Sequence, residues 1–146
     1  MKKFFIAGLL MFLGTFINAQ AWQGTGDQKV QVGLSAWGNG TGITGTYDYG
    51  ITNLLSVGGG ANVYFDNYKD NDSNNNFFIF GRLNFHLQNA LGLDSKWDVY
   101  PGVDVGIIKN TFGLGAHIGA RYFFNDKLGA FVEIGNNGSI GVSINL

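Results

Sequence analysis

The feature that most constrains the fold is an alternation of apolar residues with polar or small ones, which runs from Gln28 to the end of the chain. Alternation with a period of two indicates β-strands that have two different faces. Clusters of Gly, Asn and Asp divide the pattern into segments of strand length, and Asn136 and Asn137 form a tight turn before the last one. The predicted strands are residues 28–37, 41–49, 54–66, 76–87, 97–108, 112–123, 128–135 and 138–146.

One face of these segments is apolar throughout, whereas the other carries mainly Gly, Ser, Thr and Asn. A soluble β-sandwich or barrel would carry many Lys, Glu and Asp residues on its polar face. Only 13% of this chain is charged, against about a quarter in ordinary soluble domains. The sequence therefore predicts an all-β fold, an eight-stranded antiparallel up-and-down transmembrane β-barrel with its apolar face toward lipid. A soluble secreted barrel remains the alternative.

A narrow barrel has room for large inward side chains only where small ones face them. We therefore expect inward aromatic rings to lie against inward glycines, and outward aromatic rings to gather near the two rims. The inward rings are Tyr64, Phe78, Phe80, Tyr100 and Phe131, and the glycines are Gly58, Gly60, Gly113, Gly115 and Gly119. The outward rings are Tyr47, Tyr49, Phe85, Trp97 and Tyr122 at one rim and Phe65 and Phe77 at the other.

The first residues predict export. Lys2 and Lys3 precede an uncharged apolar run, residues 4–17, which is too short to span a bilayer as a helix but suits a signal peptide. Small residues allow cleavage after residue 19 or after residue 21. The chain thus divides into a signal peptide, residues 1–19, and an outer-membrane barrel, residues 20–146.

Composition excludes several classes of function. Without its signal peptide the chain keeps seven basic residues against ten acidic ones, which argues against nucleic acid as a partner. The chain has no cysteine, so an exported domain of this size must be stable without disulfides. Closing a sheet on itself is one way to achieve this, because it pairs the backbone groups of every strand. We expect no cofactor and no metal.

Seven ionisable residues fall on the inward face, and symmetric pairing of the short hairpins brings them close to one another. Asp98 is predicted opposite His86 on one side and Arg121 on the other, His117 opposite Glu133, and Arg82 diagonal to Asp104. An isolated charge in a dry lumen would be very costly, so oppositely charged residues should face each other there. The predicted lumen charge network is Arg82, His86, Asp98, Asp104, His117, Arg121 and Glu133.

A structural role is the favoured interpretation of this network, because the lumen of an eight-stranded barrel is filled by side chains. Catalysis or proton conduction is the alternative. An enzyme would need a nucleophile beside a base, and the sequence places no serine clearly beside His86 or His117. We therefore expect no catalytic residues.

Two further features bear on the predicted barrel. The connection at residues 67–75 is acidic and rich in Asn, and its Asp70 and Asp72 are spaced like the start of a calcium loop, but the distal glutamate position is Gly81. Pro101 lies inside the fifth strand and cannot donate a backbone hydrogen bond, so a bulge or local distortion is expected between Tyr100 and Gly102.

The segment that follows the signal peptide, residues 21–29, and the run Ser95 to Tyr100 with Gly102 and Gly106 are similar to elements of small outer-membrane barrels. The chain resembles the OmpA and OmpX kind, and most of all the short barrels of Gram-negative bacteria that carry no established activity. The last eight residues resemble a barrel-assembly signal, although this chain has Leu146 where such signals usually end in an aromatic residue. The residues of this signal are Ser139, Gly141, Ile144 and Leu146.

These observations and the resemblance together predict an integral protein of the cell outer membrane, a structural or surface protein without catalysis. A narrow channel or small-ligand conduit is the second hypothesis, and an outer-leaflet lipid-modifying enzyme is the third. The expected partners are outer-membrane lipids and, during insertion, the barrel-assembly machinery. The barrel is expected to be a monomer, and the sequence identifies no ligand.

Overall fold

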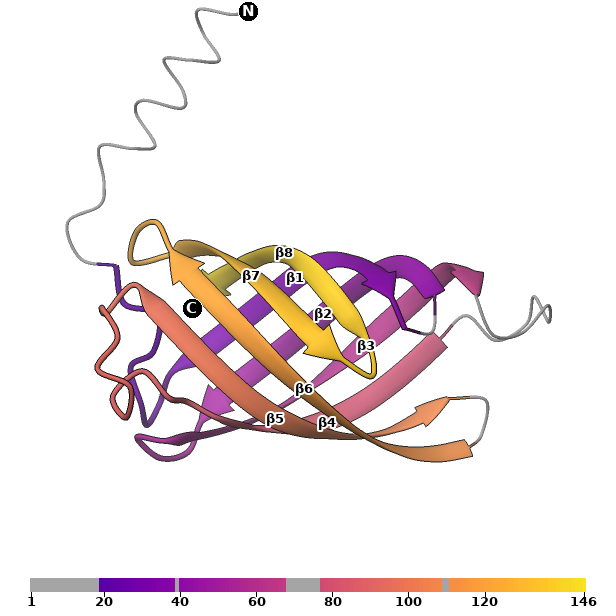
Figure 1. The fold of residues 1–146 in the computed structure, drawn as a ribbon, viewed down its shortest axis with the longest axis horizontal. Coiled ribbons are helices and arrows are strands. Elements are labelled where there is room, and N and C mark those ends of the chain that lie inside the picture. The colour runs from indigo at the N-terminus through magenta and orange to yellow at the C-terminus, as the bar shows by residue number, and fades with distance from the viewer. Residues whose placement is uncertain (1–18, 39, 68–76, 109–110) are drawn as a thin grey trace, which may run out of the picture.

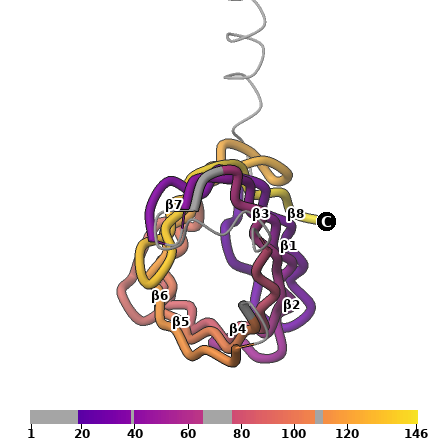
Figure 2. The backbone as a smooth tube through the Cα atoms, turned by 90° about the vertical axis from the view of Figure 1, so that its right-hand side faces the viewer, coloured from indigo at the N-terminus to yellow at the C-terminus, as the bar shows by residue number. Residues whose placement is uncertain are grey.

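The computed structural model describes residues 19–38, 40–67, 77–108 and 111–146. These residues form a closed antiparallel barrel in which each strand pairs with its sequence neighbours and β1 pairs with β8 (Figures 1 and 2). The strands are β1 (Gln28–Trp37), β2 (Gly40–Gly50), β3 (Leu55–Asn67), β4 (Phe77–Phe85), β5 (Trp97–Ile108), β6 (Thr111–Phe123), β7 (Leu128–Gly135) and β8 (Gly138–Asn145). The predicted strands and the predicted up-and-down order are therefore confirmed.

The two strands at the ends of the chain close the barrel. Lys29 lies opposite Asn145 and Ser35 lies opposite Ser139, so β1 and β8 run antiparallel along most of their length. Closure gives both strands a partner on each side, which removes the exposed edges that an open sheet would present. We call the end of the barrel where β1 begins and β8 ends the N-terminal end, and the opposite one the far end.

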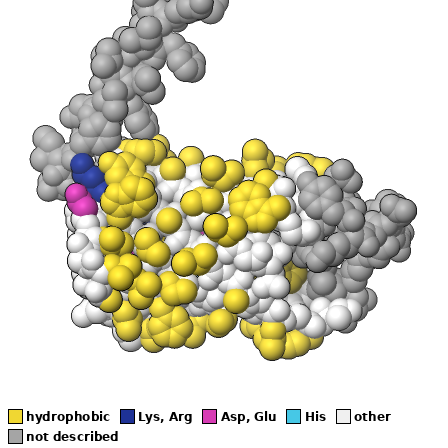
Figure 3. Space-filling view, viewed as in Figure 1, with side chains coloured by type: hydrophobic (Ala, Val, Ile, Leu, Met, Phe, Trp, Pro, Cys, Tyr) yellow, Lys and Arg dark blue, Asp and Glu magenta, His cyan; other side chains and the backbone are white. Residues whose placement is uncertain are grey.

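The two faces of the strands lie as the alternation predicts. Ile79 and Val103 on the outward face are 56% and 52% exposed, whereas Arg82 and Glu133 on the inward face are 5% and 8% exposed. Figure 3 shows hydrophobic side chains spread over the barrel wall, while the charged side chains in view gather at one end. Apolar side chains therefore cover the outside of this barrel, and its interior is polar.

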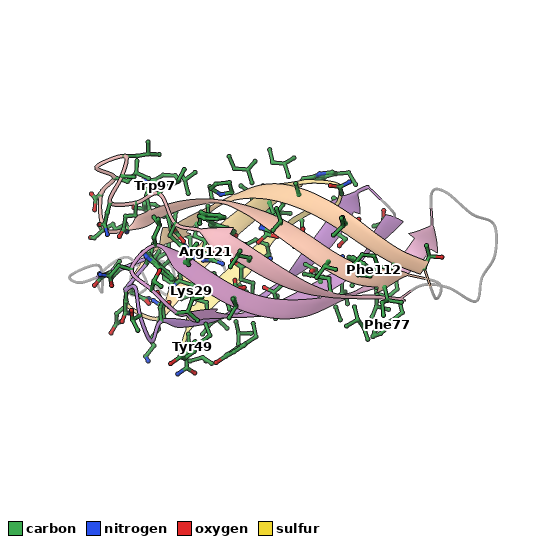
Figure 4. The ribbon with its side chains drawn as sticks, turned by 90° about the horizontal axis from the view of Figure 1, so that it is seen from below. Lys29, Tyr49, Phe77, Trp97, Phe112 and Arg121 are labelled. Carbon is green, nitrogen blue, oxygen red and sulfur yellow. The ribbon has the colours of Figure 1, made fainter. Side chains whose placement is uncertain are left out.

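Aromatic side chains mark both rims of the outer surface. Figure 4 shows Tyr49 and Trp97 near one end of the barrel and Phe77 and Phe112 near the other. All four are exposed. Two separated groups of outward aromatic rings are typical of the interface girdles of membrane barrels.

Inward glycines make room for rings at some of the predicted positions. A Cβ atom added at Gly119 would meet the ring of Tyr100, and one added at Gly60 would lie 2.6 Å from the ring of Phe80. Gly58 instead faces the carboxylate of Asp48, and a Cβ at Gly113 would meet nothing within 4 Å. The expected match of glycine and ring thus holds at Gly60 and Gly119 and is wrong at Gly58, at Gly113 and at Gly115, where a Cβ would meet Asn136.

Of the bulge or local distortion predicted at Pro101, the bulge is wrong, and the distortion is limited to an interruption of the β4–β5 pairing. Tyr100, Pro101 and Gly102 pair in unbroken register with Gly119, Ile118 and His117 of β6. On the other side, the pairing of β5 with β4 ends at Gly102, and one backbone bond from Leu87 to Val99 follows beyond the proline. The missing N–H is accommodated because it falls where the β4–β5 pairing ends.

Some predicted features fall outside the described residues. These are the signal-peptide core and nearly all of the 67–75 connection with its calcium-like spacing. Within the part of the chain that the structure describes, no helix is long and apolar enough to cross a membrane. In the same ranges, no group of three or more His, Asp or Glu side chains is arranged to hold a metal ion.

Candidate functional site

Two arginines share one carboxylate at the centre of the lumen. Arg82 of β4 donates from Nε to Oδ1 of Asp48 at 2.8 Å and from Nη2 to Oδ2 at 2.9 Å. Arg121 of β6 donates to the same Oδ2 at 2.7 Å and to Asp98 at 3.1 Å. All four residues are buried. Asp48 is therefore the hub of the network, because its carboxylate joins residues from three sides of the barrel.

A second carboxylate lies beside Arg82. Glu133 of β7 accepts hydrogen bonds from Nη1 of Arg82 at 3.1 Å, from the Tyr100 hydroxyl at 2.7 Å and from the Gln31 amide at 3.0 Å. The guanidinium of Arg121 lies 4.0 Å from the centre of the Tyr100 ring, within range of a cation–π contact. Paired charged side chains and one aromatic ring thus fill the middle of the lumen. Figure 4 shows Arg121 within the barrel.

The structure places all seven predicted residues inside the barrel, but it changes some of their partners. His86 contacts Asp98 at 2.8 Å and Arg121 contacts Asp98 at 3.1 Å, as expected. His117 lies opposite Gly135 in the register and pairs with Asp104 at 2.8 Å, so its predicted place opposite Glu133 is wrong.

Arg82 and Asp104 are directly opposite rather than diagonal. Arg82 nevertheless forms its ion pairs with Asp48 and Glu133, across the lumen from its own strand. The predicted diagonal position is therefore wrong, and so is the idea that neighbouring strands supply the partner of each charge.

The turn between β6 and β7 explains one of these register errors. The side chain of Asn125 accepts hydrogen bonds from the backbone N–H groups of Lys127 and Leu128, both at 2.8 Å, which fixes the turn. This turn makes Gly119, not His117, the residue opposite Glu133. Symmetric pairing about the middle of the connection does not allow for a turn fixed by an asparagine side chain. A register change that keeps the same residues facing inward shifts the partner of each by two positions.

Sequence reasoning missed Asp48, although a signal for it was present. Asp48 stands between Tyr47 and Tyr49, which are outward and exposed, so the alternation alone places its carboxylate in the lumen. Lys29 and Asp27 form a further buried ion pair near the N-terminal end. An inventory of every ionisable residue on the inward phase would have found Asp48 and Lys29.

A hydrogen-bonded chain of Ser56, His86 and Asp98 lies at the N-terminal end of the lumen. The hydroxyl oxygen of Ser56 is 2.7 Å from Nε2 of His86, and Nδ1 of His86 is 2.8 Å from Oδ2 of Asp98. All three side chains are at most 1% exposed. The expectation that no serine lies beside a histidine is therefore wrong. Ser56 lies on β3, His86 directly follows the paired strand β4, and both side chains point into the lumen.

Asn84 links the two histidines. Its amide nitrogen lies 3.3 Å from the oxygen of Ser56, and its amide oxygen lies 2.8 Å from Nε2 of His117. Nδ1 of His117 faces Asp104. The interior is thus a connected polar network, and such a network stabilises a fold only when its members are nearly all paired.

The segment before β1, residues 19–27, lies across the N-terminal end of the barrel. The ring of Trp22 stacks on His86, with ring centres 3.5 Å apart and planes 4° apart, and its Nε1 donates to the carbonyl of Asn53 at 2.8 Å. The backbone N–H of Ala21 donates to Ser95 at 2.7 Å. The carbonyl of Gln20 accepts from Asn145 at 3.1 Å. We call this segment the cap, because it binds residues of the β2–β3 connection, the β4–β5 connection and the last strand.

Between the ion network and the far end lies a small cavity of about 30 Å³, lined by Arg82, His117, Asp104, Glu133 and neighbouring polar residues. A water molecule needs roughly 10–15 Å³ of such space, so the cavity has room for about two or three. The lumen is therefore filled by side chains along most of its length.

The closed sheet of eight antiparallel strands, with an apolar wall and a charged, filled interior, defines a β-barrel of the transmembrane type. The fold is similar to a solved structure from work titled "De novo design of transmembrane beta-barrels", with a TM-score of 0.70 and 20% identity, over 86% of this chain and 99% of the other. The chain belongs to a family of unknown function, DUF6646, whose model matches residues 12–140. No curated protein matches it.

Proposed function

We propose that this chain is an integral barrel of the cell outer membrane, of the OmpA and OmpX kind, that serves as a non-catalytic structural or surface protein with a sealed lumen. The observation that carries the proposal is the contrast between wall and interior. Large apolar side chains such as Leu34, Ile79 and Phe112 are 59%, 56% and 66% exposed, while the ion network is buried.

An apolar surface of this extent argues for lipid around the barrel. Soluble monomers rarely expose contiguous apolar patches larger than a few hundred Å². In a bilayer the same side chains meet hydrocarbon, and the strands satisfy their backbone hydrogen bonds within the closed sheet. Outer-membrane lipids are accordingly the main partners of the folded chain, and the N-terminal end faces the periplasm.

The outer membrane is the expected location because of the signal peptide and the final strand. Ile140 and Val142 point outward and Ser139 and Ser143 inward, which matches the resemblance of this strand to a barrel-assembly signal. The assembly machinery is then a transient partner, and the barrel acts as a monomer.

A sealed lumen also favours a structural role over conduction. The cap covers one end of the lumen, Arg82 and Arg121 both lie against the ring of Tyr100, and the cavity beside them has a volume of only about 30 Å³. Buried charges paired in this way hold strands from opposite sides of the barrel together, and their separation would expose unpaired charge.

The test combines cell fractionation with a heat-dependent shift on detergent gels and with planar-bilayer recording. The proposal expects the chain in the outer-membrane fraction, faster migration before boiling than after, and no single-channel conductance. A folded chain recovered from the periplasm without detergent would refute the membrane assignment. Discrete conductance steps from the purified wild-type barrel would replace the sealed structural protein with a narrow channel.

A further inference from the structure

We infer that Ser56, His86 and Asp98 form a capped serine hydrolase centre at the N-terminal end of the lumen, whose substrate is a small uncharged carboxylic ester. In the sealed barrel this centre is idle, because the cap covers it. The inference goes beyond the structural role proposed above, and it requires the cap to move.

The first support is the order of the contacts. The hydroxyl of Ser56 faces Nε2 of His86, and Nδ1 of the same ring faces the carboxylate of Asp98, at 2.7 and 2.8 Å. A nucleophile, a base and an orienting carboxylate joined through the two ring nitrogens form the arrangement that activates serine in hydrolases on unrelated folds.

The neighbouring contacts fix the proton positions that this chemistry requires. The carboxylate of Asp98 accepts from Arg121 and from Nδ1–H of His86, which leaves Nε2 of that ring as an acceptor. The oxygen of Ser56 accepts a hydrogen bond from the Asn84 amide at 3.3 Å, so its own proton points to His86. The resting tautomer is therefore the one from which His86 can take the serine proton.

The second support is the nature of the cover over His86. The indole of Trp22 covers one face of the His86 ring, in a parallel stack with ring centres 3.5 Å apart. On the cap side, a pocket of about 90 Å³ is lined by Trp22, Asn53, Gln88 and their neighbours. Rotation of the indole out of its place would join this pocket to the space above His86.

The cap contains two points at which the backbone can pivot. Gly24 and Gly26 have φ angles of 81° and 86°, a region that residues with a side chain rarely adopt. Both lie between Trp22 and Asp27, and the ion pair of Asp27 with Lys29 anchors the cap to β1. The indole itself is held by one hydrogen bond, from Nε1 to the carbonyl of Asn53. Turning the indole outward therefore breaks this hydrogen bond and the stack on His86, while the contacts of Gln20 with Asn145 and of Ala21 with Ser95 keep the start of the cap in place.

With the cap open, the reaction follows from the residues present. Ser56 attacks the ester carbonyl carbon while its proton passes to Nε2 of His86, and the Asn84 amide stabilises the oxyanion. The imidazolium then gives the proton to the departing alcohol, which leaves an acyl group on Ser56. Water, deprotonated by His86, hydrolyses this acyl-enzyme, so that one ester and one water give one acid and one alcohol.

The size and charge of the substrate follow from the space that the cap leaves. The pocket and the position of the indole together accommodate only a small molecule, and the floor of the site is already filled by paired charges. An additional charge would meet unfavourable interactions with these pairs. An uncharged ester with a short acyl chain fits both limits.

The experiment uses the purified full-length barrel and a short-chain alkyl fluorophosphonate, which loses fluoride when a serine oxygen attacks its phosphorus. The wild type is compared with Trp22→Ala and Trp22→Leu, and each protein is shown to be folded by the heat-dependent gel shift. Ser56→Ala in each background gives the blank. Ser143→Ala is the matched control, because Ser143 is an equally buried serine whose hydroxyl has no hydrogen-bond partner among the described residues.

The expected result is a single phosphonyl adduct on Ser56, mapped by mass spectrometry, which forms at least tenfold faster in a folded Trp22 variant than in the wild type. His86→Ala should abolish it, Ser143→Ala should leave it unchanged, and the folded Trp22 variants should release nitrophenol from p-nitrophenyl acetate. If neither Trp22 variant folds, a slow Ser56 adduct on the wild type still supports the centre. Absence of an adduct above the Ser56→Ala blank in every folded protein would overturn it, as would an adduct at another residue.

Discussion

Replacement of Asp48 by asparagine should weaken the barrel more than any other single change of charge to amide. The carboxylate accepts three hydrogen bonds from two buried arginines, at 2.7 to 2.9 Å. Removing one partner of a buried ion pair typically costs about 3–5 kcal/mol. Arg82 keeps Glu133 and Arg121 keeps Asp98, so the loss is not the full sum of two pairs. We expect a loss of about 3–5 kcal/mol in the free energy of unfolding.

Urea unfolding in detergent micelles, followed by tryptophan fluorescence, measures this loss. With a slope of about 2 kcal/mol per molar urea, the expected shift of the midpoint is about 1.5–2.5 M toward lower urea. Asp126→Asn, an exposed position in the turn after β6, is the control and should shift it by less than about 0.3 M. A shift for Asp48→Asn as small as that of the control would refute the view that this carboxylate holds the two arginines in place.

Three further predictions follow from the packing and from the cap. Gly119→Val should lose about 1–3 kcal/mol in the same assay, because a side chain there overlaps the inward ring opposite, while Gly113→Val, with open space around its Cβ, should change little. Val103→Arg on the middle of the outer wall should lose about 2–4 kcal/mol if lipid or detergent surrounds the barrel; Asn89→Arg in an exposed turn should be neutral, and equal behaviour of the two would mean that water meets the wall. Intact mass of the mature protein should place signal cleavage after Ala19, since the next two residues bind the barrel through their backbone groups; a chain that starts two residues later would contradict this.

The strands and their faces were predictable because a period of two in hydropathy depends only on neighbours along the chain. Phe77 and Arg82 were assigned to the outer and inner faces from this pattern alone, and both lie there. Even Pro101, where a distortion was expected, left the phase unchanged. Local alternation therefore carries most of the information on a barrel of this kind.

The partners of the inward side chains were not predictable to the same degree. Arg82 reaches across the lumen to Asp48 and Glu133, and the choice depends on the length of the guanidinium arm and on barrel curvature rather than on the strand opposite. The contact of Ser56 with His86 likewise needs the β3–β4 register, which the alternation of residues along each strand does not give. Sequence patterns give the side of the sheet on which a residue lies, whereas three-dimensional contacts decide which neighbours it meets.

The cap carries information about the order in which this protein is made. The carbonyl of Gln20 is bound by Asn145, the residue next to the end of the chain, and the Ala21 amide is bound by the connection between β4 and β5. Asn145 is in position only when the last strand lies beside the first, whereas Ser95 belongs to the connection between β4 and β5. Gln20, although synthesised before every strand of the barrel, therefore gains its contact with Asn145 only after the last strand has been made and has closed the sheet.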